Sequence, residues 1–307
     1  MMLDRIGNVA ALVVMPFLVA GVINRVKSLW SGRKGPPILQ LVFDVVRLLR
    51  KSSVYSTTTT PVFRIAPYVL LLTALGSATI VPLLGSDPLV SFPFDFVGLA
   101  YVWGLGRVAT MLAALDTGSS FEGMGAAREA TFSTLLEPAL FLIVGALCLL
   151  SGTHTLHEAL TPHLDSGPAV VVWAAAIVAL TIVLQVETSR MPVDDPSTHL
   201  ELTMVHEVMV LDHSGPDLAA IQVGSAIKVF VGSAILATLL NPWAGSHTLR
   251  AAGVNLGLCL VVAVVIGTVE SLIARLKLRT VPQYIVVALS SGVIALLAAA
   301  WRVGGSP

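Results

Sequence analysis

Eight long apolar segments constrain the fold of this chain more than any other feature of its sequence. A helix that crosses the hydrocarbon core of a bilayer needs about 20 mostly apolar residues. Segments of about that length lie roughly at residues 6–24, 62–84, 93–115, 131–152, 168–186, 217–240, 249–272 and 281–301. They account for most of the chain. We therefore predict an all-α, polytopic membrane protein whose residues 1–307 form a single domain of eight spans.

The composition excludes several other classes of protein. Only 12% of the 307 residues are charged, whereas soluble domains carry about 25%. Basic and acidic residues balance at 18 each without a long basic run, so we expect a lipid bilayer and no nucleic acid as a partner. Cys148 and Cys259 are far apart and form no Cys-x-x-Cys. We expect no metal or cofactor held by this chain, and any redox centre must belong to a partner subunit.

Lysine and arginine gather on one side of the predicted bundle. The connections after spans one, three, five and seven hold Arg25, Lys27, Arg33, Lys34, Arg47, Arg50, Lys51, Arg128, Arg190, Arg275, Lys277 and Arg279. The opposite side holds only Arg5, Arg250 and Arg302. Cytoplasmic connections are the ones enriched in these residues, so we expect the odd-numbered connections to face the cytoplasm. The first span lacks a preceding basic region and a cleavage signal, so we expect it to be retained.

Two cytoplasmic connections, 25–61 and 187–215, are more than turns. Residues 36–50 place apolar side chains at helical spacing, which predicts an amphipathic helix on the membrane surface. The second connection is the most acidic part of the chain. A solvated loop with a short helix from about residue 199, capped by Ser197 or Thr198, explains the pattern but not the density of acids.

Five ionisable residues fall within the predicted spans. Lys228 lies about eleven residues from either end of its span, and Glu137 and Arg107 are also well inside theirs. Asp95 and Glu270 lie closer to span ends. A charge inside a span costs about 2.5–3.5 kcal/mol, so each is a candidate functional residue. We interpret the five as parts of a proton path. The alternatives are structural ion pairs for the first three and interfacial anchors for Asp95 and Glu270.

Ordered motifs along nearly the whole chain resemble one family. They are Gly35-Pro36-x-x-Leu39-Gln40-x-x-x-Asp44-x-x-Arg47, Val62-Phe63-Arg64-x-x-Pro67-Tyr68, Leu115-Asp116-Thr117-Gly118-Ser119, Gly125-Ala126-x-Arg128-Glu129, Leu136-Glu137-Pro138, Glu187-x-x-Arg190-x-Pro192-x-Asp194, Asp212-x-Ser214-Gly215 and Val269-Glu270-Ser271. The sequence closely resembles the membrane anchor subunits of energy-converting nickel-iron hydrogenases, including formate hydrogenlyase. These subunits are similar to the quinone-site membrane subunit of respiratory complex I.

The resemblance implies a non-catalytic subunit of the prokaryotic cytoplasmic (inner) membrane that anchors a hydrogenase arm and couples its electron transfer to proton translocation. Its implied partners are a nickel-iron large subunit, an iron–sulfur small subunit and antiporter-like membrane subunits. By match of motif, and by position in the same connection, the redox-coupling loop comprises Glu187, Arg190, Asp194, Asp195, Glu201, Glu207 and Asp212. The arm would dock at Asp44, Arg47, Asp116, Arg128 and Glu129.

Three departures from the family pattern bear on the function. The first loop has Gly35-Pro36-Pro37 instead of the longer motif of complex I, which favours the hydrogenase branch. Ser197 and His199 stand where many relatives have acids, and the segment from Glu201 to Ser214 is about three residues longer than usual. The alternatives are the complex I subunit, whose substrate is a quinone, a stand-alone secondary transporter, and a purely structural anchor.

Overall fold

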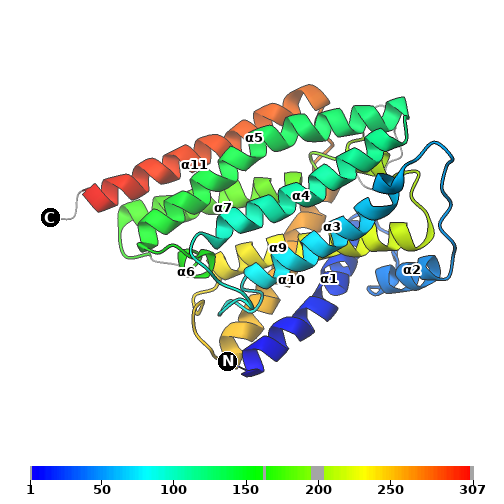
Figure 1. Cartoon of the computed structure of the whole chain (residues 1–307). Coiled ribbons are helices and arrows are strands. Elements are labelled where there is room, and N and C mark those ends of the chain that lie inside the picture. The colour runs from blue at the N-terminus through cyan, green and yellow to red at the C-terminus, as the bar shows by residue number, and fades with distance from the viewer. Residues whose placement is uncertain (1, 162–163, 195–203, 305–307) are drawn as a thin grey trace.

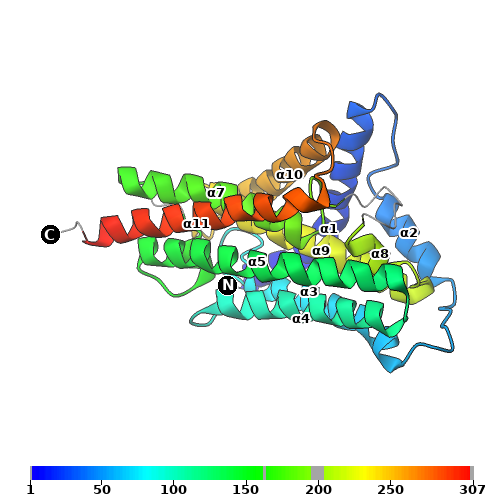
Figure 2. The ribbon, with the colours of Figure 1, turned by 90° about the horizontal axis from the view of Figure 1, so that it is seen from above.

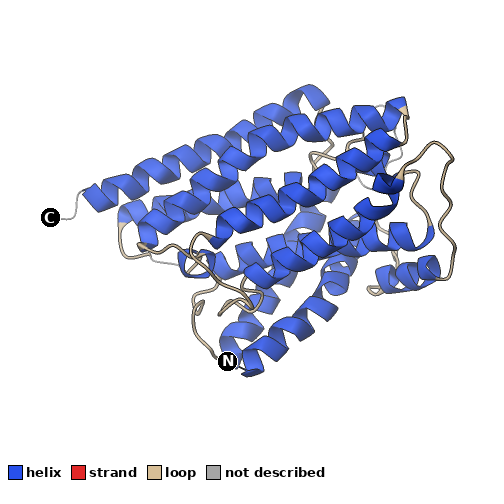
Figure 3. Ribbon diagram, in the orientation of Figure 1, coloured by secondary structure: helices blue, strands red, loops and turns tan. Residues whose placement is uncertain are grey.

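The computed structural model describes residues 2–161, 164–194 and 204–304, which form helices and loops without a strand (Figure 3). Eight of the described helices are long and apolar enough to cross a membrane. They are α1 (Met2–Trp30), α3 (Pro61–Ile80), α4 (Asp95–Asp116), α5 (Ser120–Ser151), α7 (Gly167–Glu187), α9 (Gly215–Leu240), α10 (Leu249–Leu272) and α11 (Val281–Gly304). The prediction of an all-α, polytopic membrane protein is confirmed.

Local sequence signals explain where several helices begin. The Thr60 side chain accepts a hydrogen bond from the Val62 N–H, and Pro61 opens α3. Thr248 caps α10 by accepting from the Ala251 N–H. Serine or threonine before the first turn satisfies an unpaired backbone donor, and proline is tolerated there because its missing N–H is not needed.

Two helices are longer than the apolar pattern predicted. α5 begins at Ser120 rather than near residue 131, and α1 continues to Trp30 rather than ending near residue 24. The additional turns carry charged side chains, so they do not belong to the continuous apolar segments from which the spans were predicted. In α5 one of these, Arg128, donates to the Met204 carbonyl at 2.8 Å, so its charge is used in a tertiary contact.

The helix α9 is the centre of the bundle. It contacts α1, α3, α7 and α10, and Figure 1 shows it among them. In the most apolar 18-residue stretch of α9, 83% of the residues are buried inside the protein. The corresponding share for the helix that includes α11 is 28%. A charged residue near the middle of α9 is therefore surrounded by protein and not by lipid.

The short helices mark the two ends of the bundle (Figure 2). α2 (Gln40–Leu49) and α8 (His206–Val210) lie at one end, and α6 (Leu156–Ala159) lies at the other end with the start of α1 and the end of α11. α2 contacts α1 and α9, burying Leu48 while Phe43 and Leu49 stay exposed. It is the amphipathic helix predicted within 36–50. The predicted helix start near residue 199 lies outside the described residues.

Candidate functional site

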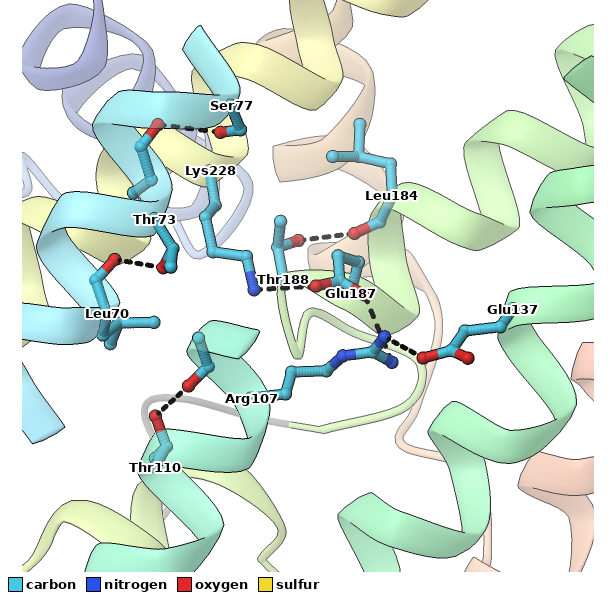
Figure 4. A network of polar contacts seen from close by, with 12 residues as sticks. Leu70, Thr73, Ser77, Arg107, Thr110, Glu137, Leu184, Glu187, Thr188 and Lys228 are labelled. Carbon is cyan, nitrogen blue, oxygen red and sulfur yellow. Dashed lines mark hydrogen bonds and ion pairs between the residues drawn. The ribbon is translucent and has the colours of Figure 1, made fainter. Parts of the chain in front are cut away.

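A chain of ion pairs joins four helices inside the bundle. The Nζ atom of Lys228 on α9 donates to Oε1 of Glu187, the last residue of α7, at 2.7 Å. Nη1 of Arg107 on α4 lies 3.6 Å from Oε2 of the same carboxylate. Nη2 of Arg107 donates to Oε1 of Glu137 on α5 at 2.6 Å. Figure 4 shows these four side chains converging between their helices.

The burial of these ion pairs explains why the charged residues occur together. Lys228, Glu187 and Arg107 are all at least nine-tenths buried. Removing a charge from water costs several kcal/mol, which only close opposite charges offset. The sequence placed Glu187 in a connecting loop, whereas the structure brings it to the three charges predicted within spans. Lys228, Arg107 and Glu137 are therefore ion-paired residues, and their arrangement is compatible with a path for protons.

A small cavity of about 30 Å³ lies against the ion pairs. Its wall includes Arg107, Glu129, Glu187, His206 and Lys228. A volume of this size accommodates one or two water molecules when polar groups line it. Water there would contact carboxylate, ammonium and imidazole groups within one small space, which is the arrangement that proton exchange between side chains requires.

A second group of charges surrounds Glu270 near the end of α10. Lys27 of α1 lies 3.0 Å from Oε2 of Glu270, and Arg190 lies 3.4 Å from Oε1. The Glu270 side chain is fully buried. The alternative of an interfacial anchor is wrong for Glu270, because two cations from other segments hold it inside the protein.

Asp194 connects the acidic loop to α8 and to the segment that follows α10. Its Oδ2 accepts hydrogen bonds from the backbone N–H groups of Val205 and His206, both at 2.9 Å, which caps the start of α8. Its Oδ1 lies 2.8 Å from Nη2 of Arg275. Asp194 therefore links the position of the start of α8 to that of Arg275.

His206 stands between the loop and the buried ion pairs. Burial lowers the pKa of His206 to about 4, and the charge of Lys228 adds to this effect, whereas Asp194 and Glu187 oppose it. The imidazole is therefore neutral at pH 7, with one nitrogen that donates a proton and one that accepts it.

Asp95 lies apart from the other predicted path residues. It is fully buried at the α6 end of the bundle, where Oδ1 accepts from the Leu156 N–H at 2.7 Å and Oδ2 lies 3.4 Å from the Ser91 hydroxyl. These contacts fix the start of α6. Asp95 does not reach headgroups as an interfacial anchor would, and the structure does not bring it to the ion-pair chain.

The predicted docking residues have different surroundings. Asp44 and Arg47 pair with each other on the surface of α2 at 3.1 Å. Oδ2 of Asp116 accepts from the backbone of Thr60 at 2.7 Å, which supports the start of α3. Glu129 lies in the wall of the buried cavity and not on the surface, where a docking residue would lie.

The remaining predicted loop residues are only partly described. Asp195 and Glu201 lie outside the described residues. Glu207 lies in α8 beside His206, in the wall of a larger pocket of about 330 Å³. Asp212 is exposed and lines a surface pocket of about 420 Å³ with Tyr55 and His213.

Two acidic residues of this region were not predicted as site residues from the sequence. Glu122 is buried in the first turn of α5, and its Oε2 has no hydrogen-bond partner among the described residues. Asp217 of α9 accepts from the Tyr68 hydroxyl at 2.9 Å. Asp217 is the first residue of a predicted span, and Glu122 falls in the predicted connection between spans 93–115 and 131–152. A charge is unremarkable at either place, so the pattern held no signal for them. In the described part of the chain, no group of three or more His, Cys, Asp or Glu is arranged to hold a metal ion.

The architecture and the buried charges define a class of membrane protein. Residues 5–301 match the model of the family described as NADH dehydrogenase, so the chain belongs to this family. This confirms the resemblance drawn from the motifs. Its homologues are membrane subunits of multi-subunit oxidoreductase complexes, and this chain is a multi-pass membrane protein of the same kind.

Particular relatives come from both branches of the family. Formate hydrogenlyase subunit 4 of Escherichia coli is 28% identical over 279 residues, covering 87% of this chain and 88% of the relative. Hydrogenase-4 component C of the same organism is 28% identical over 269 residues, covering 87% and 82%. A subunit of the NADH-quinone oxidoreductase of Methylococcus capsulatus is 27% identical over 251 residues, covering 78% and 77%.

The fold also matches a solved structure. A chain of the membrane-bound sulfane sulfur reductase, an archaeal respiratory membrane complex, superposes with a TM-score of 0.78. The match covers 96% of this chain and 98% of the other at 18% sequence identity. At that identity the similarity concerns the fold alone.

Proposed function

We propose that this chain is the membrane anchor subunit of an energy-converting nickel-iron hydrogenase, in which it couples electron transfer in a peripheral arm to proton translocation. The observation that carries the proposal is the chain of ion pairs Lys228–Glu187–Arg107–Glu137, whose first three members are buried. The similarity to formate hydrogenlyase subunit 4 and to hydrogenase-4 component C favours this branch of the family.

Coupling begins at the end of the bundle that carries α2 and α8. This is the cytoplasmic end in our proposal, since the lysine-rich and arginine-rich connections are there. A redox change in the arm alters the charge near the acidic loop, and Asp194 transmits the change because it holds both α8 and Arg275. His206 then moves relative to Lys228, and the ion pairs of Glu187 rearrange.

Glu137 gives the chain of ion pairs a lateral exit. It lies near the middle of α5, and 47% of its side chain is exposed. A residue near the middle of a spanning helix is exposed on the side of the bundle and not at its end. A carboxylate facing lipid is costly, so a neighbouring membrane subunit with polar groups covers this position. An antiporter-like subunit fits that requirement.

The arm docks at the same end as α2. Arg47 is an exposed charge of α2 that pairs with the half-buried Asp44, and Asp212 is exposed near the start of α9. The nickel-iron centre and the iron–sulfur clusters reside in the docked large and small subunits.

A quinone-binding complex I subunit is the second candidate. The pocket of about 330 Å³ is lined by α1, α8 and α9, with Leu41 of α2 at its edge. It shares His206 and Ser225 with the small cavity. An elongated apolar molecule with a polar head could enter from the membrane surface and reach His206. This geometry supports the quinone alternative.

Purification of the native complex tests the proposal. The tagged chain is extracted from its own membrane in mild detergent, and the accompanying proteins and metals are identified. Nickel and iron with a hydrogenase large subunit are expected. Iron without nickel, together with flavin subunits and bound quinone, would move the chain to complex I. Recovery of the chain alone would favour a transporter.

A further inference from the structure

We infer that Glu129 is the proton-loading residue of the buried ion-pair chain, the side chain on which a proton resides before it passes towards Glu137. This inference rests on the proposed function and names a residue for it. The resemblance places Glu129 beside Arg128 in a docking motif, whereas the structure places it inside the bundle, where it is 9% exposed.

Glu129 differs from the other acids of the site in its partners. Glu187 contacts Lys228 and Arg107, and Glu137 contacts Arg107. Glu129 forms no hydrogen bond or ion pair with the described residues. A carboxylate that is held between cations can be protonated only at the cost of an ion pair. The acid without such a partner therefore exchanges a proton most readily.

The position of Glu129 gives it access to water. It lines the cavity of about 30 Å³ together with Arg107, Lys228 and His206. His206 and Ser225 also line the pocket of about 330 Å³ that contains Arg190 and Glu207 of the acidic loop. These two residues therefore form the partition between the larger pocket and the cavity.

The proton transfer is balanced by water and the imidazole. Neutral His206 gives a proton to cavity water and takes another from the side of the larger pocket. The water gives its proton to a carboxylate oxygen of Glu129, so one O–H bond forms as another breaks. Proton uptake neutralises Glu129, so that Arg107 interacts only with the charges of Glu187 and Glu137. Loss of the proton restores a third acid that competes for Arg107.

The helix α5 connects Glu129 to the lateral exit. Glu129 and Glu137 are eight residues apart on the same continuous helix, which is about 12 Å along its axis. Arg107 spans part of that distance, since it lines the cavity with Glu129 and donates to Glu137. Arg107 therefore lies between Glu129 and Glu137, in the direction in which the proton released by Glu129 would move.

Substitution of Glu129 in the whole complex tests the inference. E129Q keeps the shape of the side chain and removes the titratable group. We expect hydrogen evolution without a proton gradient to stay within about twofold of wild type, while proton translocation falls about tenfold or more. E129D should restore part of the translocation. The matched control is E122Q, which removes a buried acid seven residues earlier on α5 and outside the cavity.

Two outcomes would overturn the inference separately from the proposed function. Full translocation in E129Q together with loss in E137Q would remove Glu129 from the path and leave the path itself. If the wild-type complex translocates no protons, infrared difference spectra on reduction still decide about Glu129. A carboxyl band that is present in wild type and E122Q and absent in E129Q supports proton exchange at Glu129. A band that persists in E129Q contradicts it.

Discussion

The Nζ atom of Lys228 lies 2.7 Å from Oε1 of Glu187, and both side chains are more than nine-tenths buried. The two residues are not equivalent. Glu187 also faces Arg107 at 3.6 Å, whereas Lys228 forms no ion pair with any other described residue. The carboxylate is therefore the shared partner on which both cations depend.

This asymmetry predicts different costs for removing either partner. E187Q leaves Lys228 buried without a counter-charge, so we expect a loss of about 3–5 kcal/mol in the free energy of unfolding. K228M leaves Glu187 paired with Arg107 and should cost less. The double variant should be more stable than E187Q. Chemical or thermal unfolding of the purified chain in detergent measures all three, and equal losses for both single variants would contradict the account.

Gly125 of α5 permits close contact with α8. A Cβ atom at this position would lie 2.4 Å from Cγ1 of Val208 and 2.9 Å from the Val205 carbonyl oxygen. G125A should therefore displace α8 and cost about 1–3 kcal/mol. G123A on the same helix is the control, because nothing lies within 4 Å of a Cβ there. Thermal unfolding of both variants checks the prediction, and an unchanged midpoint in G125A would disprove the contact.

Loss of the Asp194 charge should reduce stability more than loss of the Asp44 charge on the surface of α2. D194N weakens the pair with Arg275 and the cap of α8 together, so we expect a loss of about 2–4 kcal/mol and faster proteolysis of the 204–211 segment. D44N removes a surface pair with Arg47 and should change stability by less than about 0.5 kcal/mol. Limited proteolysis followed by mass spectrometry distinguishes the two. Similar cleavage in both variants would argue against the role of Asp194.

His213 gives the surface near α9 a dependence on pH. Its ring stacks on Phe63 with centroids 4.0 Å apart, and burial lowers the pKa of His213 to about 4. An ordinary histidine has a pKa of about 6.5. Between those values the unfolded state binds the proton and the native state does not, so the stability contributed by neutral His213 is lost as pH falls from about 6.5 to 4.

The variant H213F tests this dependence. Phenylalanine retains the stacking and does not titrate, so residues 211–215 should be better protected from hydrogen exchange than in wild type at pH 5, and equally protected at pH 7.5. H154F is the control, because His154 contacts Phe94 at the opposite end of the bundle. A difference between H213F and wild type that is the same at both pH values would contradict the prediction.

The apolar pattern predicted the helical class and most of the span positions, because spacing and length alone determine them. It could not locate Glu187 within the site, because whether Glu187 lies in a loop or in the last turn of α7 depends on tertiary contacts with Lys228 and Arg107. Glu129 shows the same limit. A carboxylate next to an arginine is typical of a solvated surface, and only the helix contacts of α5 turn it towards the cavity.

The individual charges within spans were predicted with partial success. Lys228, Arg107 and Glu137 were expected inside the bundle from their distance to span ends, and they lie in one network. Asp95 has the same chemistry but caps α6, because the Leu156 N–H lies next to it. Which buried acid serves a path and which serves a helix start depends on neighbours that are distant in sequence.

Proton translocation by the E137Q complex tests the central claim most directly. Glu158 of α6 is exposed at the opposite end of the bundle from α2 and serves as the control. Inverted membrane vesicles containing the wild-type complex, E137Q or E158Q are supplied with the electron donor, and hydrogen and internal acidification are measured together. The account predicts that E137Q evolves hydrogen at a rate within about twofold of wild type while acidification falls about tenfold or more, and that E158Q matches wild type in both. Wild-type acidification in E137Q, from vesicles with equal amounts of assembled complex, would contradict the claim that the ion-pair chain carries protons.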